Sequence, residues 1–267
     1  MRNVSLLLAL LCAALPGGAE AEEPPVAEQL VSVSLVAEQA SAGSAWWLGV
    51  VFEVADGWHI YWQNPGGSGM ETTVSLLLPE GWSSEEVQFP GPERFQDPGD
   101  IETFGYQGGT VLMATVQPPP DWSSLALLSA ESTYLVCREV CLFGEATATL
   151  ALEAGAPSGF SPITLHEARL RLPRPLETLA GAKWSQEGEG TDQSLVLSTG
   201  SELPTDFFPS LNSVDLFGAT ASARVMEGNQ IRLPLSGAAA SGRIAQGVLA
   251  TRGEAGSSFW QVAVPLN

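Results

Sequence analysis

The sequence has few basic residues, and this shortage excludes a class of partners. Lys and Arg number 11 against 30 Asp and Glu, with Lys183 the single lysine, so the formal net charge is −19. A chain of this charge repels phosphate backbones, so we expect no nucleic-acid partner. Calcium loops place acidic residues at alternate positions, and the sequence has no D-x-D run. We interpret the acidity as a solubility feature.

Long apolar runs are also missing, except at the start of the chain. Residues 4–15 are almost all apolar, Arg2 precedes them, and Ala19-Glu20-Ala21 follows a Pro-Gly-Gly break. This pattern is typical of an export signal cleaved after Ala21, and it is shorter than the roughly 20 residues that span a bilayer. Leu11 precedes Cys12 where a lipidation signal would carry a small residue. We therefore predict a signal peptide at 1–21, no lipid anchor and no membrane span.

Cysteine is scarce as well, and its placement is informative. Removal of residues 1–21 leaves Cys137 and Cys141, and an isolated pair in an oxidising compartment predicts a disulfide. If the chain reverses at 138–140, the two residues face each other in a hairpin, where opposed Cα atoms lie about 4.5–5.5 Å apart, within the disulfide range. A loop this small contributes little chain entropy, which suits a bond that opens and closes. The residues alone leave a redox pair and a structural clip equally open.

Other chemistry for the cysteines is disfavoured. Zinc needs four ligands at recognisable spacing, whereas His59 and His166 are far apart in the sequence. No nucleophile motif surrounds Cys137 or Cys141, which argues against a hydrolase. We therefore expect no metal and no cofactor.

Short alternating segments separated by Gly and Pro turns predict an all-β chain. The predicted strands cover 30–36, 46–54, 58–62, 72–78, 111–116, 125–136 and 146–152, then 194–197, 221–225, 230–235, 247–251 and 259–264. Between the two series, the pattern breaks at 155–159, Ser161-Pro162 predicts a helix start, and Pro173 and Pro175 end the helix. We predict two β-sandwich domains, 22–154 and 181–267, joined by a linker with a short helix at 155–180.

Five motifs occur in order along residues 30–152. They are DGWHIYWQNPGGSG at 56–69, LPEGW at 78–82, PGPERF at 90–95, FGY at 104–106, and LVCREVC at 135–141 with GEA at 144–146. Together they resemble the periplasmic N-terminal region of DsbD/ScsB-type protein-disulfide reductases. FFP at 207–209 and the last strands are similar to the second β-domain of the ScsB-like branch, and the three-residue cysteine spacer also fits that branch.

The resemblance implies immunoglobulin-like domains and thiol–disulfide exchange. It implies that Cys141 forms the mixed disulfide with a partner and that Cys137 resolves it. An aromatic cap covers the pair in that family, and Phe104 is the matching residue here. His59 and Tyr61 match positions beside the pair.

The resemblance also implies the partners. Family members continue into a membrane electron carrier and a thioredoxin domain, and this sequence ends at Asn267, so we expect a separate CcdA/DsbD-type membrane donor. We predict a periplasmic interchange protein that acts as a protein-disulfide reductase component and passes these electrons to thioredoxin-fold proteins. The alternative is a non-enzymatic exported binding protein, for a partner protein or copper, with a structural disulfide.

Overall fold

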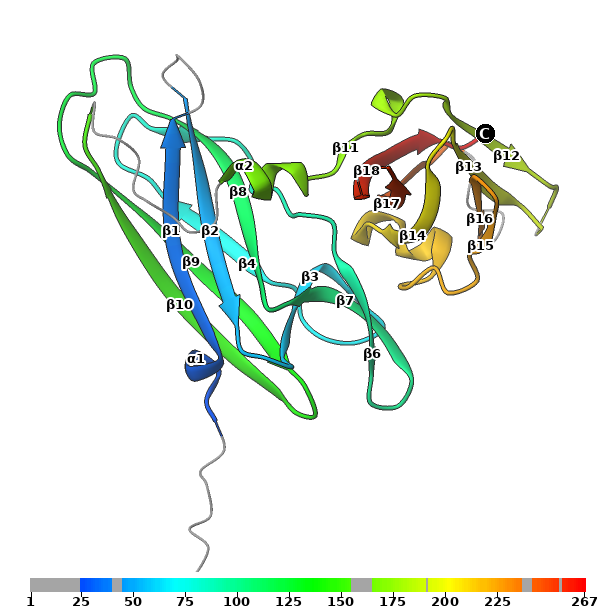
Figure 1. Ribbon diagram of the computed structural model, residues 1–267, viewed down its shortest axis with the longest axis horizontal. Coiled ribbons are helices and arrows are strands. Elements are labelled where there is room, and N and C mark those ends of the chain that lie inside the picture. The colour runs from blue at the N-terminus through cyan, green and yellow to red at the C-terminus, as the bar shows by residue number, and fades with distance from the viewer. Residues whose placement is uncertain (1–24, 40–44, 155–164, 191, 237–241, 255) are drawn as a thin grey trace, which may run out of the picture.

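The computed structural model describes residues 25–39, 45–154, 165–190, 192–236, 242–254 and 256–267. The predicted export signal at 1–21 and the predicted helix start at Ser161-Pro162 lie outside the described residues. Strands make up most of the described chain, and they form two bodies of two sheets each (Figure 1). The predicted all-β fold with two sandwiches is therefore confirmed.

The first body, at the left of Figure 1, contains two antiparallel sheets. One sheet has the spatial order β1 (Val31–Gln39), β2 (Trp46–Val54), β8 (Gly109–Gln117) and β5 (Ser83–Ser84). The other has the order β10 (Cys141–Leu152), β9 (Ala126–Cys137), β3 (His59–Gly66), β7 (Ile101–Gln107) and β6 (Glu93–Asp97), and β4 (Thr73–Leu77) also pairs with β9. A short helix, α1 (Ala27–Leu30), precedes β1.

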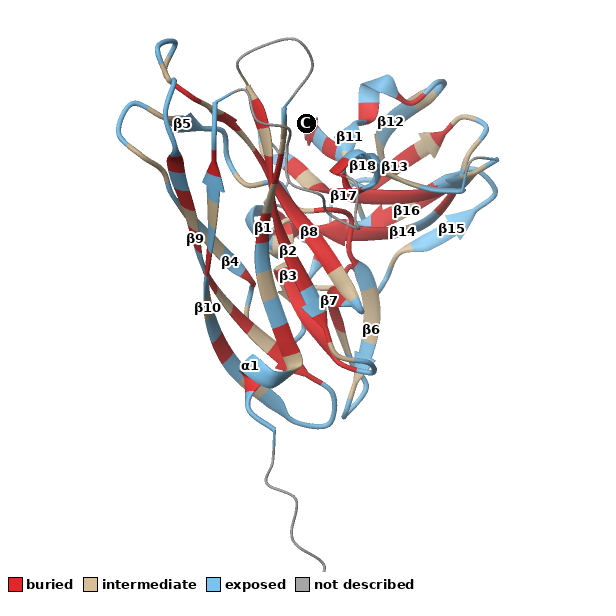
Figure 2. Ribbon diagram, turned by 60° about the vertical axis from the view of Figure 1, so that its left-hand side comes forward, coloured by how far each residue is buried: buried red, intermediate tan, exposed pale blue. Residues whose placement is uncertain are grey.

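An aromatic core fills the space between these two sheets. Five of its large aromatic side chains are at most 3% exposed: Trp46, Phe52, Trp62, Phe104 and Tyr134. The Phe52 and Tyr134 rings meet edge to face with centroids 6.2 Å apart, a favourable arrangement for aromatic pairs. Figure 2 shows the buried residues in red along the central strands of this body.

Strand β2 is covered on both faces, which explains why its sequence lacks polar alternation. Helix α2 (Leu165–Leu170) packs on the outer face, where Leu165 and Ala168 contact Val51 and Val111. A Cβ atom at Gly49 would lie 2.6 Å from the Leu165 side chain. Glycine at this position therefore permits the close approach of the helix.

The second body also contains two sheets. One has the order β11 (Arg174–Pro175), β18 (Gly256–Pro265), β17 (Ile244–Gly253) and β14 (Leu203–Pro209), and the other β12 (Ala182–Glu187), β13 (Ser194–Thr199), β16 (Gln230–Pro234) and β15 (Val225–Glu227). Short helical turns are η1 (Leu176–Thr178), η2 (Leu211–Ser213) and α3 (Val214–Phe217). Among the described residues, no helix combines the length and the hydrophobicity that a bilayer crossing requires.

The two bodies share an apolar contact. Phe208 of β14 lies with its ring centroid 6.2 Å from Trp62 and 5.1 Å from Phe104. Val248 and Ala250 of β17 also belong to the core cluster of the first body. The second body therefore closes one end of the first core.

Candidate functional site

The cysteine pair closes the long β9–β10 hairpin. Cys137 is the last residue of β9 and Cys141 the first of β10, and the two are paired in register. Their sulfur atoms are bonded at 2.03 Å and their Cα atoms lie 4.2 Å apart. The turn at 138–140 is exposed, and the Arg138 N–H donates to the Val140 carbonyl. The chain thus reverses where the sequence predicts.

The two cysteines differ in exposure. Cys137 is only 2% exposed, because β9 lies inside the sheet and its Cα partner on the other side is His59 of β3. Cys141 is an exposed residue, since β10 is the edge strand of the sheet. A second protein can therefore approach Cys141 more directly than Cys137.

Two side chains from β3 lie beside the pair. His59 is in register with Cys137, so both side chains project from the same face of the sheet. Two residues further on, the Tyr61 hydroxyl lies 3.9 Å from Cys141 Sγ. His59 and Tyr61 are both buried, at 6% and 1% exposure. The structure thus brings together four of the five residues that the resemblance selects.

An aspartate that the sequence reasoning missed joins this group. Asp97, at the end of β6, accepts hydrogen bonds from the Tyr61 and Thr103 hydroxyls, each at 3.1 Å. Its other carboxylate oxygen lies 3.6 Å from His59 Nε2. Asp97 begins the run Asp97-Pro98-Gly99, which by itself indicates only a turn.

Phe104 does not cover the disulfide, contrary to the expectation from the resemblance. It is fully buried, and its ring contacts Trp62 and Phe208 in the core. Side chains alternate along a strand, and Thr103, next to Phe104 in β7, is the one that faces Asp97. Phe104 therefore lies on the opposite face of the sheet from the disulfide.

Phe95 is the phenylalanine of β6 that lies on the same face of the sheet as the disulfide. Its Cα partner across β6 and β7 is Thr103, so it projects to the same side as that residue. The Phe95 ring stacks on His59 with centroids 4.6 Å apart and an angle of 11°. Phe95 thus covers the histidine that stands next to Cys137.

A glycine loop packs on Tyr61 from another side. Gly69 has φ of +104°, and a Cβ atom there would lie 2.5 Å from the Tyr61 ring. The Thr72 hydroxyl donates to the Tyr61 carbonyl at 2.7 Å. The loop that carries these residues therefore fixes the position of the tyrosine.

Burial sets the protonation of the two β3 side chains. Burial lowers the pKa of His59, and the nearby charge of Asp97 only partly opposes that effect. Burial, followed by the charge of Asp97 and its hydrogen bond, raises the pKa of Tyr61 far above its ordinary value. Near neutral pH the imidazole is therefore neutral, and the phenol keeps its proton.

The surface around Cys141 is partly apolar. Val140 and Phe143 are 57% and 53% exposed, and both lie within two residues of Cys141. In the turn, the Arg138 guanidinium carbon lies 5.2 Å from the centroid of the Trp58 ring. Within the described residues, no group of three or more His, Cys, Asp or Glu is placed to hold a metal ion.

Two comparisons with known proteins find a match, one to the first body and one to most of the chain. Residues 27–153 match the family model described as thiol:disulfide interchange protein DsbD, N-terminal. A solved structure, the N-terminal periplasmic domain of ScsB from Proteus mirabilis, has a TM-score of 0.60 at 16% identity, covering 89% of this chain and 94% of that chain. That match spans both bodies and shows a common fold. A search of curated proteins finds no match.

Proposed function

We propose that this protein, whose residues 27–153 form a DsbD/ScsB-type N-terminal region, exchanges disulfides with partner proteins through Cys137 and Cys141. One observation carries the proposal: an exposed Cys141 is bonded to a buried Cys137 beside the Tyr61–Asp97 hydrogen bond. Exchange requires one sulfur that a partner can reach in line and a second that resolves the intermediate.

The reaction transfers two electrons. In the reduced protein, the Cys141 thiolate attacks a partner disulfide, forms a mixed disulfide and releases one partner thiolate. The Cys137 thiolate then attacks Cys141 Sγ, the mixed disulfide breaks, and the second partner thiolate leaves. The protein ends oxidised and the partner reduced, and the two protons of the original thiols balance those taken up by the partner.

Tyr61 supplies a hydrogen bond that can change acceptor. It has one hydroxyl proton, which it donates to Asp97 while Cys141 is in the disulfide. When Cys141 becomes a thiolate, the same proton can turn towards the sulfur 3.9 Å away. Hydrogen bonding to the charged form stabilises it, so this contact favours the thiolate that attacks and leaves.

We propose thioredoxin-fold proteins as partners and a separate CcdA/DsbD-type membrane protein as electron donor. Val140 and Phe143 form an exposed apolar rim on which such a partner can pack around Cys141. Exchange of this kind belongs in the periplasm, where disulfides form and persist. The similarity to the N-terminal periplasmic domain of ScsB supports this location.

We propose the division into an export signal at 1–21, a redox domain at 22–154, a linker at 155–180 and a second domain at 181–267. Strand β10 ends at Leu152, which supports the first boundary. Before residue 181, however, Arg174 and Pro175 pair with β18, and Leu176 and Leu179 enter the second core. The end of the linker therefore folds as part of the second domain.

Trapping of the mixed disulfide tests the proposed function. The single variants Cys137→Ser and Cys141→Ser are each mixed with an oxidised thioredoxin-fold protein and separated by non-reducing electrophoresis. We expect the Cys137→Ser protein to accumulate a mixed disulfide, because Cys141 attacks and nothing resolves the product. Equal trapping by both variants would contradict the assignment of Cys141, and trapping by neither would favour the binding-protein alternative.

A further inference from the structure

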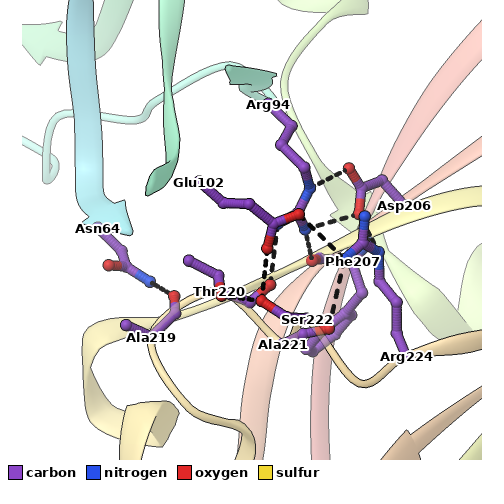
Figure 3. Close-up of polar contacts among 10 residues, drawn as sticks. All are labelled: Asn64, Arg94, Glu102, Asp206, Phe207, Ala219, Thr220, Ala221, Ser222 and Arg224. Carbon is purple, nitrogen blue, oxygen red and sulfur yellow. Dashed lines mark hydrogen bonds and ion pairs between the residues drawn. The ribbon is translucent and has the colours of Figure 1, made fainter. Parts of the chain in front are cut away.

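The β6–β7 hairpin has two faces with different neighbours. On one face, Phe95, Asp97 and Thr103 surround His59 and Tyr61 in the site of the disulfide. On the opposite face, Arg94 and Glu102 point into the second body, as the close-up in Figure 3 shows. The alternation of side chains along the two strands thus connects the site to the second body.

Arg94 makes the main contact across the bodies. Its Nε and Nη2 atoms donate to the two carboxylate oxygens of Asp206 at 2.9 and 2.8 Å, which is the bidentate arrangement. Its remaining donors reach the Phe207 carbonyl at 3.1 Å and the Thr220 carbonyl at 3.0 Å. The side chains of Arg94 and Asp206 are only 13% and 15% exposed. Such a fixed and shielded pair restrains the strand that carries it.

Glu102 makes a second contact from β7. It lies 3.1 Å from Arg94 and accepts a hydrogen bond from Ser222 of the second body (Figure 3). Burial alone would raise the pKa of Glu102, but the Ser222 hydrogen bond and the charges of Arg94 and Arg224 lower it. Arg224 also pairs with Asp206 at 2.8 Å. Two acids and two arginines thus form one network across the interface.

Strand β3, which carries His59 and Tyr61, is anchored in the same way. Asn64 is buried, and its side-chain amide donates to the Pro209 and Ala219 carbonyls of the second body at 2.7 and 3.1 Å. Every strand that contributes a polar group to the site, apart from the cysteine hairpin itself, therefore has a side chain bonded to the second body.

We propose that the second body is a positioning unit for the redox site, acting through the Arg94–Asp206 link on the β6–β7 hairpin. Strand β6 is the edge of its sheet, and among the described strands it pairs only with β7, so its position depends on the contacts that its side chains make on both faces. With the link in place, Phe95 stays on His59 and Asp97 keeps the Tyr61 proton. The inference rests on the proposed function, because it assigns a role in exchange to a domain without cysteine.

Loss of the link should change the reactivity of Cys141 in a predictable direction. If the hairpin moves outward, the Asp97 carboxylate leaves Tyr61, and the phenol is free to donate to a Cys141 thiolate. The negative charge near the sulfur is removed at the same time. Both effects favour the thiolate, so alkylation should become faster and its pH midpoint should fall.

The test uses Asp206→Asn in a Cys137→Ser background, with Cys141 alkylation by iodoacetamide followed on its peptide by mass spectrometry. We expect the rate at pH 7 to rise about fivefold, the ratio that corresponds to about 1 kcal/mol. Asp215→Asn is the matched control, because it breaks the Arg243–Asp215 pair within the second body. The control should leave both the rate and the pH midpoint unchanged.

Two further measurements separate positioning from general loosening. Asp97→Asn alone should also speed alkylation, and Asp206→Asn should then add nothing to it. Hydrogen exchange of the Asp206→Asn protein should rise in the peptide covering 93–107 and stay unchanged in β1 and β2. A wild-type alkylation rate in a folded Asp206→Asn protein, or effects of Asp206→Asn and Asp97→Asn that multiply, would overturn the inference. Alkylation needs no partner protein, so this result stands apart from the trapping test of the proposed function.

Discussion

Reduction of the disulfide should cost this fold little. The bond closes a loop of only five residues, Cys137–Cys141, and the chain-entropy relation for that length gives about 2 kcal/mol at 25 °C. Twelve residues on each of β9 and β10 are already paired in register, so the hairpin survives without the bond. For a protein of this size, about 2 kcal/mol corresponds to a fall of about 4–8 °C in Tm.

The same free energy links folding to redox chemistry. Whatever the disulfide adds to the stability of the fold, the fold adds to the stability of the disulfide. About 2 kcal/mol lowers the reduction potential of the pair by about 40 mV relative to the unfolded chain, since 30 mV corresponds to about 1.4 kcal/mol for two electrons. The fold thus biases the pair only slightly and leaves it reducible.

Differential scanning calorimetry of the oxidised and the dithiothreitol-reduced protein measures this cost. Dithiothreitol kept in the reduced sample prevents reoxidation, and a Cys137→Ala/Cys141→Ala variant measured with and without dithiothreitol controls for effects of the reagent. We expect one cooperative transition in each sample and a small fall in Tm after reduction. A reduced protein that is unfolded at 25 °C, or a fall in Tm above about 15 °C, would refute the reasoning and make the bond a structural clip.

Two further predictions concern side chains of the first body. Phe104→Ala should lower the free energy of unfolding by about 3–5 kcal/mol without faster alkylation of Cys141. Phe95→Ala should lower it by only about 1 kcal/mol and make the alkylation of Cys141 faster. Urea unfolding measures the stability of each variant, and mass spectrometry measures the alkylation. The pKa of His59 is lowered in the folded state, so the unfolded chain binds the proton more tightly. The contribution of the neutral imidazole to stability is therefore fully present above about pH 6.5 and is lost as the pH falls below that value. His59→Gln should lose less stability than the wild type between pH 6.5 and 5 in urea unfolding, and parallel curves would disprove the buried, neutral imidazole.

The cysteine hairpin could be predicted from the sequence because its signals are local. Two β-prone segments flank a three-residue turn, and alternation alone places Cys137 opposite Cys141. The position of Tyr61 beside the pair came from a resemblance that covers β3. In these cases, the residues that determine the geometry are close in sequence or belong to one continuous motif.

The wall of the site could not be predicted, because it depends on strand register. No strand is predicted over 93–107, where the structure has β6 and β7, and the β3–β7 pairing shifts between Tyr61 and Gly66. Strand register decides which side chains of β6 and β7 face the disulfide, and it leaves no local signal in the sequence. The contact of Arg94 with Asp206 joins residues 112 apart, which only the docked second body brings together.

The reduction potential of the Cys137–Cys141 pair tests the central claim most directly. The protein is equilibrated in buffers of reduced and oxidised glutathione, quenched with acid, alkylated and weighed by mass spectrometry. A redox-active pair predicts a sigmoidal transition between the disulfide and the dithiol, with a midpoint above about −300 mV. A protein that stays fully oxidised below about −300 mV would show that the bond is structural and would contradict the account.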